Sequence, residues 1–215
     1  MSKKPNSIAL IDMDGVVVIG NSNIAVATEL GQRDFALELE EQRKRDEINT
    51  AEYNRRISKI YEGLTQEDIL SLWDKLPKIG DIEKTNDELK RRYVVPVILT
   101  SGLGDFARIC TERFGFFHYH GAELVFQDGK STGERNLCVE PEDKIVYAKE
   151  LCRTYAVEES ALTSVEDSIS GLPIFMFLKE VDGKTIAFND YEGRLSSFSD
   201  HSIKSDSLYS IVQFF

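Results

Sequence analysis

Four short runs of apolar residues, each ending abruptly in polar residues or glycine, constrain the fold of this chain most. They are residues 7–12 (SIALID), 94–102 (VVPVILTSG), 161–168 (ALTSVEDS) and 185–190 (TIAFND). Continuous apolar runs of this length are typical of parallel strands that are buried on both faces of a sheet. Residues 104–114 and 140–155 have helical patterns, so helices alternate with the strands. The sequence therefore predicts an α/β fold with a Rossmann-like parallel sheet and helices on both faces.

The stretch from about residue 22 to 80 interrupts this alternation, because it contains no strand-like run and has the pattern of three or four amphipathic helices. Asn49 with Glu52, and Thr65 with Asp68, resemble capping boxes at two helix starts. We expect a small helical cap, residues 19–81, inserted after the first strand of a core formed by residues 1–18 and 82–215. Residues 123–130 (ELVFQDGK) predict a β-hairpin.

The charge of the chain limits its partners. The formal net charge is -11 and the sequence pI is about 4.9, so the surface repels nucleic acids and anionic membranes. Asp12 interrupts the N-terminal apolar stretch, which is too short for a signal peptide or a membrane span. The three cysteines Cys110, Cys138 and Cys152 lack metal-ligand spacing and fit a reducing compartment. We expect a cytoplasmic protein, either a monomer or a homodimer, with no nucleic acid and no membrane partner.

Two carboxylates follow the first predicted strand. Asp12 and Asp14 are two residues apart in an extended segment, so their side chains project to the same side, and Gly15 allows a sharp turn beside a ligand. This pattern alone fits a surface turn or a calcium-binding loop as well as a catalytic site. The third run ends in Glu166 and Asp167, again at the carboxyl end of a strand, where open α/β sheets bind ligands.

The second predicted strand ends in residues of a different kind. Thr100, Ser101 and Gly102 offer two hydroxyl groups and unhindered main-chain amides just before a helix, an arrangement that suits phosphate oxygens. Lys144 lies near the start of a later helix, where a lysine is commonly solvated. These groups come, in chain order, to one edge of the predicted sheet. Their joint occurrence indicates a site for a phosphate group.

Together, the segments IDMDG, ILTSG, Lys144 and VEDSISG resemble the four motifs of the haloacid dehalogenase (HAD) superfamily of phosphohydrolases. That superfamily also places a helical cap directly after its first motif. Within it, the order and spacing of GLTQEDI, the TSG turn and QDGKSTG are similar to those of phosphoserine phosphatases. The resemblance implies a phosphatase that hydrolyses a small phosphorylated metabolite.

The resemblance also implies a role for each of these residues. Asp12 would attack phosphorus and form an aspartyl-phosphate, and Asp14 would be the general acid and base. Thr100, Ser101 and Gly102 would hold the phosphate, and Lys144 would neutralise its developing charge. Mg²⁺ is the implied cofactor, since it prefers hard oxygen ligands. Its implied ligands are the carboxylate of Asp12, the main-chain carbonyl of Asp14 and the carboxylate of Asp167, with Glu166 as a second candidate.

The expected substrate contacts lie in the cap. Phosphoserine phosphatases usually have a glutamate where Asn21 stands, and Arg56 is the candidate for an anionic group of the substrate. Because a neutral amide compensates an ammonium poorly, we expect phosphoserine to be a poor substrate unless another acid, Glu29 first, replaces the missing one. Two alternatives stay open: a phosphotransferase or mutase that uses the same aspartyl-phosphate, and a catalytically inactive binding protein on the same fold.

Overall fold

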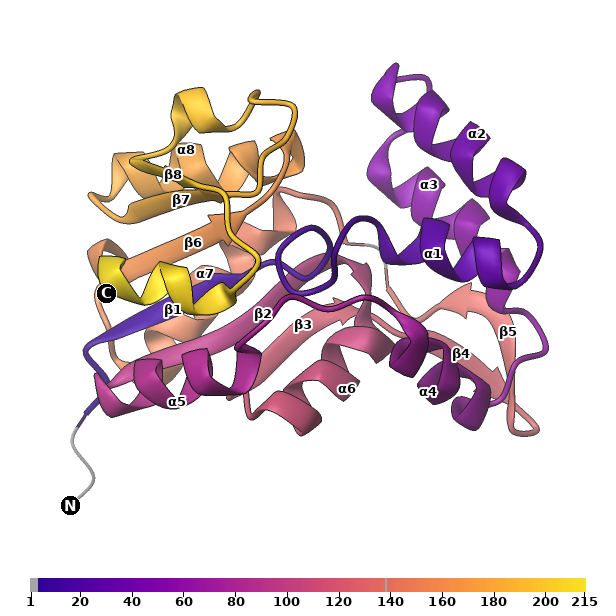
Figure 1. Ribbon diagram of the computed structural model, residues 1–215, viewed down its shortest axis with the longest axis horizontal. Helices are drawn as coiled ribbons and strands as arrows, with labels where there is room; N and C mark the ends of the chain where they lie inside the picture. Colours follow the sequence, from indigo (N-terminus) through magenta and orange to yellow (C-terminus); the bar gives the residue numbers. More distant parts are fainter. Residues whose placement is uncertain (1–3, 138) are drawn as a thin grey trace.

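The protein is built around one six-stranded sheet with the strand order β3-β2-β1-β6-β7-β8 (Figure 1). The computed structural model describes residues 4–137 and 139–215, so Cys138 lies outside the described residues. All five strand pairs of this sheet are parallel. The predicted α/β fold with a Rossmann-like parallel sheet is therefore confirmed.

The four predicted runs are all strands of this sheet. They form β1 (Ser7–Ile11), β2 (Val94–Leu103), β6 (Leu162–Glu166) and β7 (Lys184–Phe188). Two further strands, β3 (His118–Ala122) and β8 (His201–Ile203), lie at the edges of the sheet and were not predicted. The two strands next to β1 are β2 and β6, so their carboxyl ends meet at the centre of one sheet edge.

Helices cover both faces of the sheet. The helices α5 (Ile82–Arg91), α6 (Gly104–Phe114) and η5 (Leu208–Phe214) contribute to one hydrophobic cluster with Ala9 and Ile11 of β1. The helices α7 (Asp143–Tyr155) and α8 (Leu172–Glu180) contribute to a second cluster with Ile8 and Leu10. Successive side chains of β1 thus alternate between two apolar layers, as a central parallel strand requires. Three short 3₁₀ helices complete this part: η2 (Glu159–Ala161), η3 (Ile169–Gly171) and η4 (Ser196–Phe198).

The segment after β1 is helical, as predicted. It contains α1 (Ser22–Glu29), α2 (Arg33–Lys44), α3 (Thr50–Ile57), η1 (Ser58–Tyr61) and α4 (Gln66–Lys75). Thr65 and Asp68 form the predicted capping box at the start of α4. Asn49 caps α3 by accepting a hydrogen bond from the main-chain N–H of Glu52, but the Glu52 carboxylate binds Arg55 instead of completing the box. No helix in the described part of the chain is long and apolar enough to cross a membrane.

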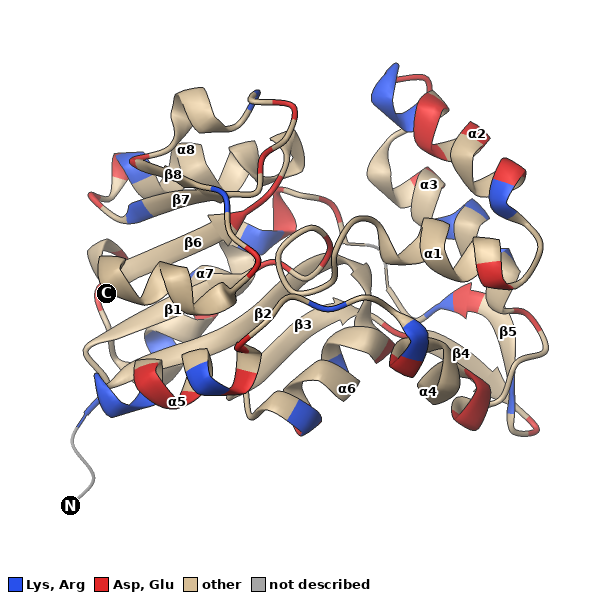
Figure 2. Ribbon diagram, viewed as in Figure 1, with Lys and Arg blue, Asp and Glu red and all other residues tan. Residues whose placement is uncertain are grey.

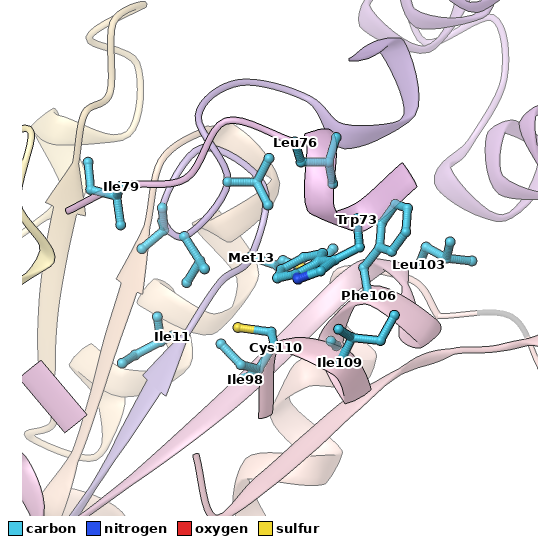
Figure 3. Close-up of a cluster of buried hydrophobic side chains, with 14 of the residues drawn as sticks. Ile11, Met13, Trp73, Leu76, Ile79, Ile98, Leu103, Phe106, Ile109 and Cys110 are labelled. Carbon is cyan, nitrogen blue, oxygen red and sulfur yellow. The ribbon is translucent and has the colours of Figure 1, made fainter. Parts of the chain in front are cut away.

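The helices of this segment divide between two positions. Figure 1 shows α1, α2 and α3 beside the sheet, beyond the end of β1, whereas α4 lies near α6. Trp73 of α4 is fully buried and packs on Phe106 of α6, with 5.6 Å between the ring centroids (Figure 3). That residues 19–81 form a single cap remains a prediction, because α4 shares its apolar contacts with the core.

The predicted hairpin consists of β4 (Leu124–Gln127) and β5 (Lys130–Arg135). Asp128 and Gly129 both have positive φ, 50° and 78°, as a tight two-residue turn requires. Ser131 of β5 exchanges main-chain hydrogen bonds of 2.8 Å with Gly63 and Leu64, the residues between η1 and α4. The hairpin therefore joins the inserted segment to the core.

Candidate active site

The end of β1 directs two carboxylates to the same side. Met13, between Asp12 and Asp14, is fully buried and packs with Trp73 in the hydrophobic cluster of Figure 3. Because side chains alternate in an extended segment, Asp12 and Asp14 face the opposite way, and both line a cavity of about 350 Å³. Figure 2 shows that β1 and β2 carry no charged residue along their length, so the charges gather where the strands end.

The cavity brings together most of the residues predicted from the sequence. Its core side is lined by Asp12, Asp14, Thr100, Ser101, Gly102, Lys144 and Asp167. The side formed by the inserted helices is lined by Asn21, Asn23, Glu40, Arg43, Tyr53 and Asn54, among others. The cavity thus lies between the carboxyl ends of the central strands and the helices α1 to α3.

Lys144 is a buried cation that lines the core side of the cavity. Its side chain is 1% exposed, and its Nζ lies 2.7 Å from Glu166 Oε2 and 3.3 Å from Asp12 Oδ1. Burial opposes the charged form, but the nearby charges of Asp12 and Glu166 hold the pKa of Lys144 above its ordinary value. Lys144 therefore remains an ammonium group beside one oxygen of Asp12.

Glu166 has a supporting position. One of its carboxylate oxygens accepts a hydrogen bond from Lys144, and the other accepts one of 3.0 Å from Ser164 Oγ. Its side chain is 1% exposed and does not line the cavity. Both oxygens are engaged by Lys144 and Ser164, and a role for Glu166 as a second metal ligand stays a prediction.

Asp14 has the properties of a group that changes its protonation state near neutral pH. Its Oδ1 accepts a 2.9 Å hydrogen bond from the main-chain N–H of Ser22 at the start of α1. Burial, with a further contribution from the charge of Asp12, raises the pKa of Asp14 to about 6. A carboxyl group with a pKa in this range can donate and then accept a proton in one catalytic cycle.

Asp167 lines the cavity, and Gly15 lies directly against its carboxylate. Burial, and next the charge of Asp12, raise the pKa of Asp167 to about 7. Gly15 has φ +77°, and a Cβ atom there would lie 1.9 Å from Asp167 Oδ2, so the carboxylate occupies space that only glycine leaves open. The charges of Asp12 and Asp14 both disfavour the ionised form of Asp167. A cation bound among these carboxylates would offset that repulsion.

The donor set fits Mg²⁺ better than a softer metal. The part of the chain that the structure describes contains no cluster of three or more acidic, histidine or cysteine side chains around one point. Mg²⁺ commonly binds through one or two carboxylates and keeps several waters or phosphate oxygens. Asp12 and Asp167 provide two carboxylates with oxygen donors only, which fits this way of binding Mg²⁺.

The C-terminal end of β2, residues 100–102, presents hydrogen-bond donors to the cavity. The Gly102 N–H donates a 2.9 Å hydrogen bond to Thr100 Oγ1, so the proton of the Thr100 hydroxyl is available to an acceptor. Ser101 Oγ is buried and has no hydrogen-bond partner among the described residues. The Ser101 carbonyl is already engaged, since it accepts a 2.8 Å hydrogen bond from Asn54 Nδ2. Buried hydroxyl groups without partners are expected where a ligand binds.

The cap residues named from the sequence differ in position. Asn21 lines the cavity, but its Oδ1 also caps α1 by accepting a 3.2 Å hydrogen bond from the Ile24 N–H. Arg56 does not line the cavity, because its Nη1 donates to Gln42 Oε1 at 2.8 Å, between α3 and α2. Glu29 also lies outside, where it pairs with Lys75 of α4. A role for Glu29 at the substrate stays a prediction, and the pair with Lys75 would have to open for it.

Glu40 and Arg43 are two charged cavity residues that sequence analysis missed, as it also missed Lys44, Asp46, Glu192 and Arg194. Both come from α2, and together with Tyr53 of α3 they form the inner surface of the inserted helices. The i, i+3 spacing of Glu40 and Arg43 predicts that they pair on one helix face. Which face of α2 meets the cavity depends on tertiary packing, so no local signal could have selected them.

Comparison with solved structures relates the fold to known enzymes. A phospho-aspartyl intermediate analogue of phosphoserine phosphatase matches with a TM-score of 0.82 and 20% identity, covering 99% of this chain and 100% of that chain. A substrate-bound phosphoserine phosphatase matches with a TM-score of 0.83 and 19% identity, covering 99% and 100%. A HAD family hydrolase from Salmonella enterica serovar Typhi matches with a TM-score of 0.87 and 15% identity, covering 99% of this chain and 72% of that chain.

No family model and no curated protein matches the sequence. The chain therefore has the fold of phosphoserine phosphatases and HAD hydrolases. Because the sequence identity is 20% or less, the similarity establishes the fold and not the activity. The predicted likeness of fold is confirmed.

Proposed function

We propose that this protein is a Mg²⁺-dependent phosphomonoester hydrolase that acts through an aspartyl-phosphate on Asp12. The observation that supports this most is the position of Lys144 Nζ, 3.3 Å from Asp12 Oδ1, with Asp14 in the same cavity. A carboxylate held beside an ammonium, with a second carboxyl of raised pKa nearby, is an arrangement for nucleophilic attack with acid and base assistance.

In the first half of the proposed reaction, a carboxylate oxygen of Asp12 attacks phosphorus and the bond between phosphorus and the ester oxygen breaks. Protonated Asp14 gives its proton to the leaving oxygen, so the product departs as an alcohol. In the second half, Asp14 accepts a proton from water as the water attacks phosphorus. Inorganic phosphate leaves and the Asp12 carboxylate is restored.

The other residues hold the phosphoryl group. The hydroxyls of Thr100 and Ser101 and the ammonium of Lys144 would face its oxygens. Hydrogen bonds to Gly102 and Glu166 hold Thr100 and Lys144 in place before the substrate enters. We assign Asp12, Asp167 and the main-chain carbonyl of Asp14 as the groups that would hold Mg²⁺. When bound, Mg²⁺ would supply positive charge to the phosphoryl oxygens in addition to that of Lys144, beside the three carboxyl groups of Asp12, Asp14 and Asp167.

The size of the cavity supports a small substrate. A volume of about 350 Å³ is near the lower end of the range for small-molecule sites, about 300–1,000 Å³. The inserted helices form one side of the cavity, and a cavity of this size favours a metabolite over a phosphorylated protein. We therefore propose a small phosphorylated metabolite as the substrate.

The test is release of inorganic phosphate from p-nitrophenyl phosphate by the purified protein, with Mg²⁺ and with EDTA. We expect release that requires Mg²⁺. Release that persists in EDTA would remove the metal from the proposal. If no phosphate is released and the protein still binds beryllium fluoride with Mg²⁺, the inactive alternative is favoured. Transfer of the phosphoryl group to an added alcohol in place of water would favour the phosphotransferase alternative.

A further inference from the structure

We propose that the leaving group of the substrate is uncharged and carries hydroxyl groups, as in the phosphate ester of a polyol or a small sugar. This inference rests on the proposed function and adds the substrate class. It is carried by the charged residues on the side of the cavity that the leaving group would face, because these residues are already paired with one another.

Glu40 and Arg43 form the innermost pair. Arg43 Nη2 donates to Glu40 Oε1 at 2.6 Å, and Arg43 Nε donates to Glu40 Oε2 at 3.2 Å, so the guanidinium and the carboxylate bind through two bonds. The Arg43 guanidinium also lies over the ring of Tyr53, 5.5 Å from its centroid. Glu40 is 7% exposed, so water does not compensate its charge if the pair is broken.

This pair disfavours charged leaving groups of either sign. An ammonium that approached Glu40 would compete with a guanidinium already bound to both oxygens. A carboxylate that approached Arg43 would lie next to the Glu40 carboxylate and be repelled by it. Each would lose hydration without gaining an uncompensated opposite charge.

The charged residues at the rim are also paired or solvated. Lys44 Nζ lies 3.8 Å from Glu192 Oε1, and Arg194 Nη1 lies 3.7 Å from Glu192 Oε2. Asp46 is exposed to solvent. Among the described residues, the enclosed part of the cavity on this side therefore presents no unpaired charge.

The neutral groups that remain suit hydroxyls. Tyr53 is 4% exposed, and its hydroxyl has no hydrogen-bond partner among the described residues. Asn23 Oδ1 accepts a 3.0 Å hydrogen bond from the Tyr61 hydroxyl, which leaves the Asn23 amide group as a donor. Asn54 Nδ2 donates to Ser101, which leaves the Asn54 amide oxygen as an acceptor. A hydroxyl group both donates and accepts, whereas an ammonium only donates and a carboxylate only accepts.

The first experiment compares four esters of similar size with the wild-type protein and Mg²⁺: glycerol 3-phosphate, 3-phosphoglycerate, phosphoethanolamine and phosphoserine. We expect kcat/KM for glycerol 3-phosphate to exceed that for each charged ester by at least about tenfold. A smaller margin over any of them overturns the inference. If neither these esters nor p-nitrophenyl phosphate is hydrolysed, the proposed function fails first.

The second experiment uncouples the pair. Glu40→Gln leaves Arg43 unpaired, so kcat/KM for 3-phosphoglycerate relative to glycerol 3-phosphate should rise at least about fivefold. Arg43→Gln leaves Glu40 unpaired and should raise the same ratio for phosphoethanolamine. Glu38→Gln, on the exposed side of α2, is the matched control and should leave both ratios unchanged.

The double variant Glu40→Gln/Arg43→Gln guards against a single variant that does not fold. It removes both charges and should keep the preference for glycerol 3-phosphate. Ratios that do not shift in the folded single variants, or a preference lost in the double variant, would show that the pair does not exclude charged leaving groups.

Discussion

Arg135 Nη1 donates a 2.8 Å hydrogen bond to the main-chain carbonyl oxygen of Gly102, which ties the β4–β5 hairpin to the C-terminal end of β2. Arg135 Nε donates at 2.6 Å to Ser58 Oγ, and Ser58 Oγ donates at 2.6 Å to the carbonyl of Asn54. Asn54 Nδ2 donates to the carbonyl of Ser101, in the same end of β2. The end of β2, the hairpin and the inserted helices are thus linked by one chain of hydrogen bonds, which occupies the carbonyls of Ser101 and Gly102.

We predict that Arg135→Met lowers activity more than stability. A hydrogen bond from a charged group contributes roughly 1.5–3 kcal/mol, so loss of the bond to Gly102 should lower kcat/KM for p-nitrophenyl phosphate by about tenfold or more. Arg135 Nη2 is buried without a partner among the described residues, and methionine removes that unsatisfied donor. The free energy of unfolding should therefore change by less than about 2 kcal/mol.

Steady-state kinetics and urea unfolding measure the two effects. Arg91→Met, at an exposed arginine that pairs with Glu88, is the control for loss of an arginine and should match the wild type in both. If Arg135→Met leaves kcat/KM unchanged, the hydrogen bond to Gly102 does not position the C-terminal end of β2.

Gly15→Ala should impair the site through Asp167. The added Cβ would lie 1.9 Å from Asp167 Oδ2, so the carboxylate has to move. We expect the Mg²⁺ concentration for half-maximal activity to rise by at least about tenfold, which corresponds to about 1.4 kcal/mol of binding free energy. Titration of activity with Mg²⁺ measures this.

Gly129→Ala separates the effect of the clash from that of the backbone. Gly129 has nearly the same φ, +78°, and nothing lies within 4 Å of the position that an added Cβ would take. It should lose about 1–2 kcal/mol of stability from the left-handed backbone and keep the Mg²⁺ requirement of the wild type. An equal Mg²⁺ requirement in both variants would contradict a role for the close approach of Gly15 to Asp167.

The parts of the site that follow from strand geometry were accessible from the sequence. A buried parallel strand needs a continuous apolar run, and the residue after such a run lies at the sheet edge, which placed Asp12, Thr100 and Asp167 together. The edge strands β3 and β8 could not be predicted in this way. β3 has the sequence HYHGA, and β8 is only three residues long, so neither has the apolar run of a central strand.

The substrate side of the cavity was not accessible in this way. Arg56 and Arg43 both lie on amphipathic helices, and the choice between them depends on how α2 and α3 pack, which sets Arg56 against Gln42 and turns Arg43 inward. Arg135 was missed because its contact with Gly102 spans 33 residues and connects the hairpin to the end of β2. Local patterns carry no information about such a contact.

Asp12→Asn should abolish turnover. An amide cannot attack phosphorus as a carboxylate does, so we expect kcat for p-nitrophenyl phosphate to fall by at least about three orders of magnitude. The fold should remain, since the oxygen of the introduced amide can still accept the 2.8 Å hydrogen bond that Asp12 Oδ1 receives from the Met13 N–H. Circular dichroism checks the fold, and Asp87→Asn on the exposed surface of α5 is the matched control. A folded Asp12→Asn variant with more than about a tenth of wild-type kcat would exclude Asp12 as the nucleophile.

The metal-free protein should become less stable as pH rises from 5 to 8. The pKa values of Asp14 and Asp167 in the folded protein are about 6 and about 7, raised from an ordinary value of 3.8 mainly by burial. The folded state therefore holds these protons more tightly than the unfolded state. The resulting stabilisation is complete below about pH 4 and is lost as pH rises through 6 and 7, by an amount on the order of 2–5 kcal/mol.

Urea unfolding in EDTA at pH 5, 6, 7 and 8 measures this loss. Asp167→Asn cannot ionise at that position, so its free energy of unfolding should fall less between pH 5 and 8 than that of the wild type. Mg²⁺ added at pH 8 should stabilise the wild type, because it binds the ionised carboxylates of the folded state, and should have little effect on Asp167→Asn. The same pH dependence in both proteins would mean that Asp167 is not held protonated by its surroundings, and a full response of Asp167→Asn to Mg²⁺ would place the metal elsewhere.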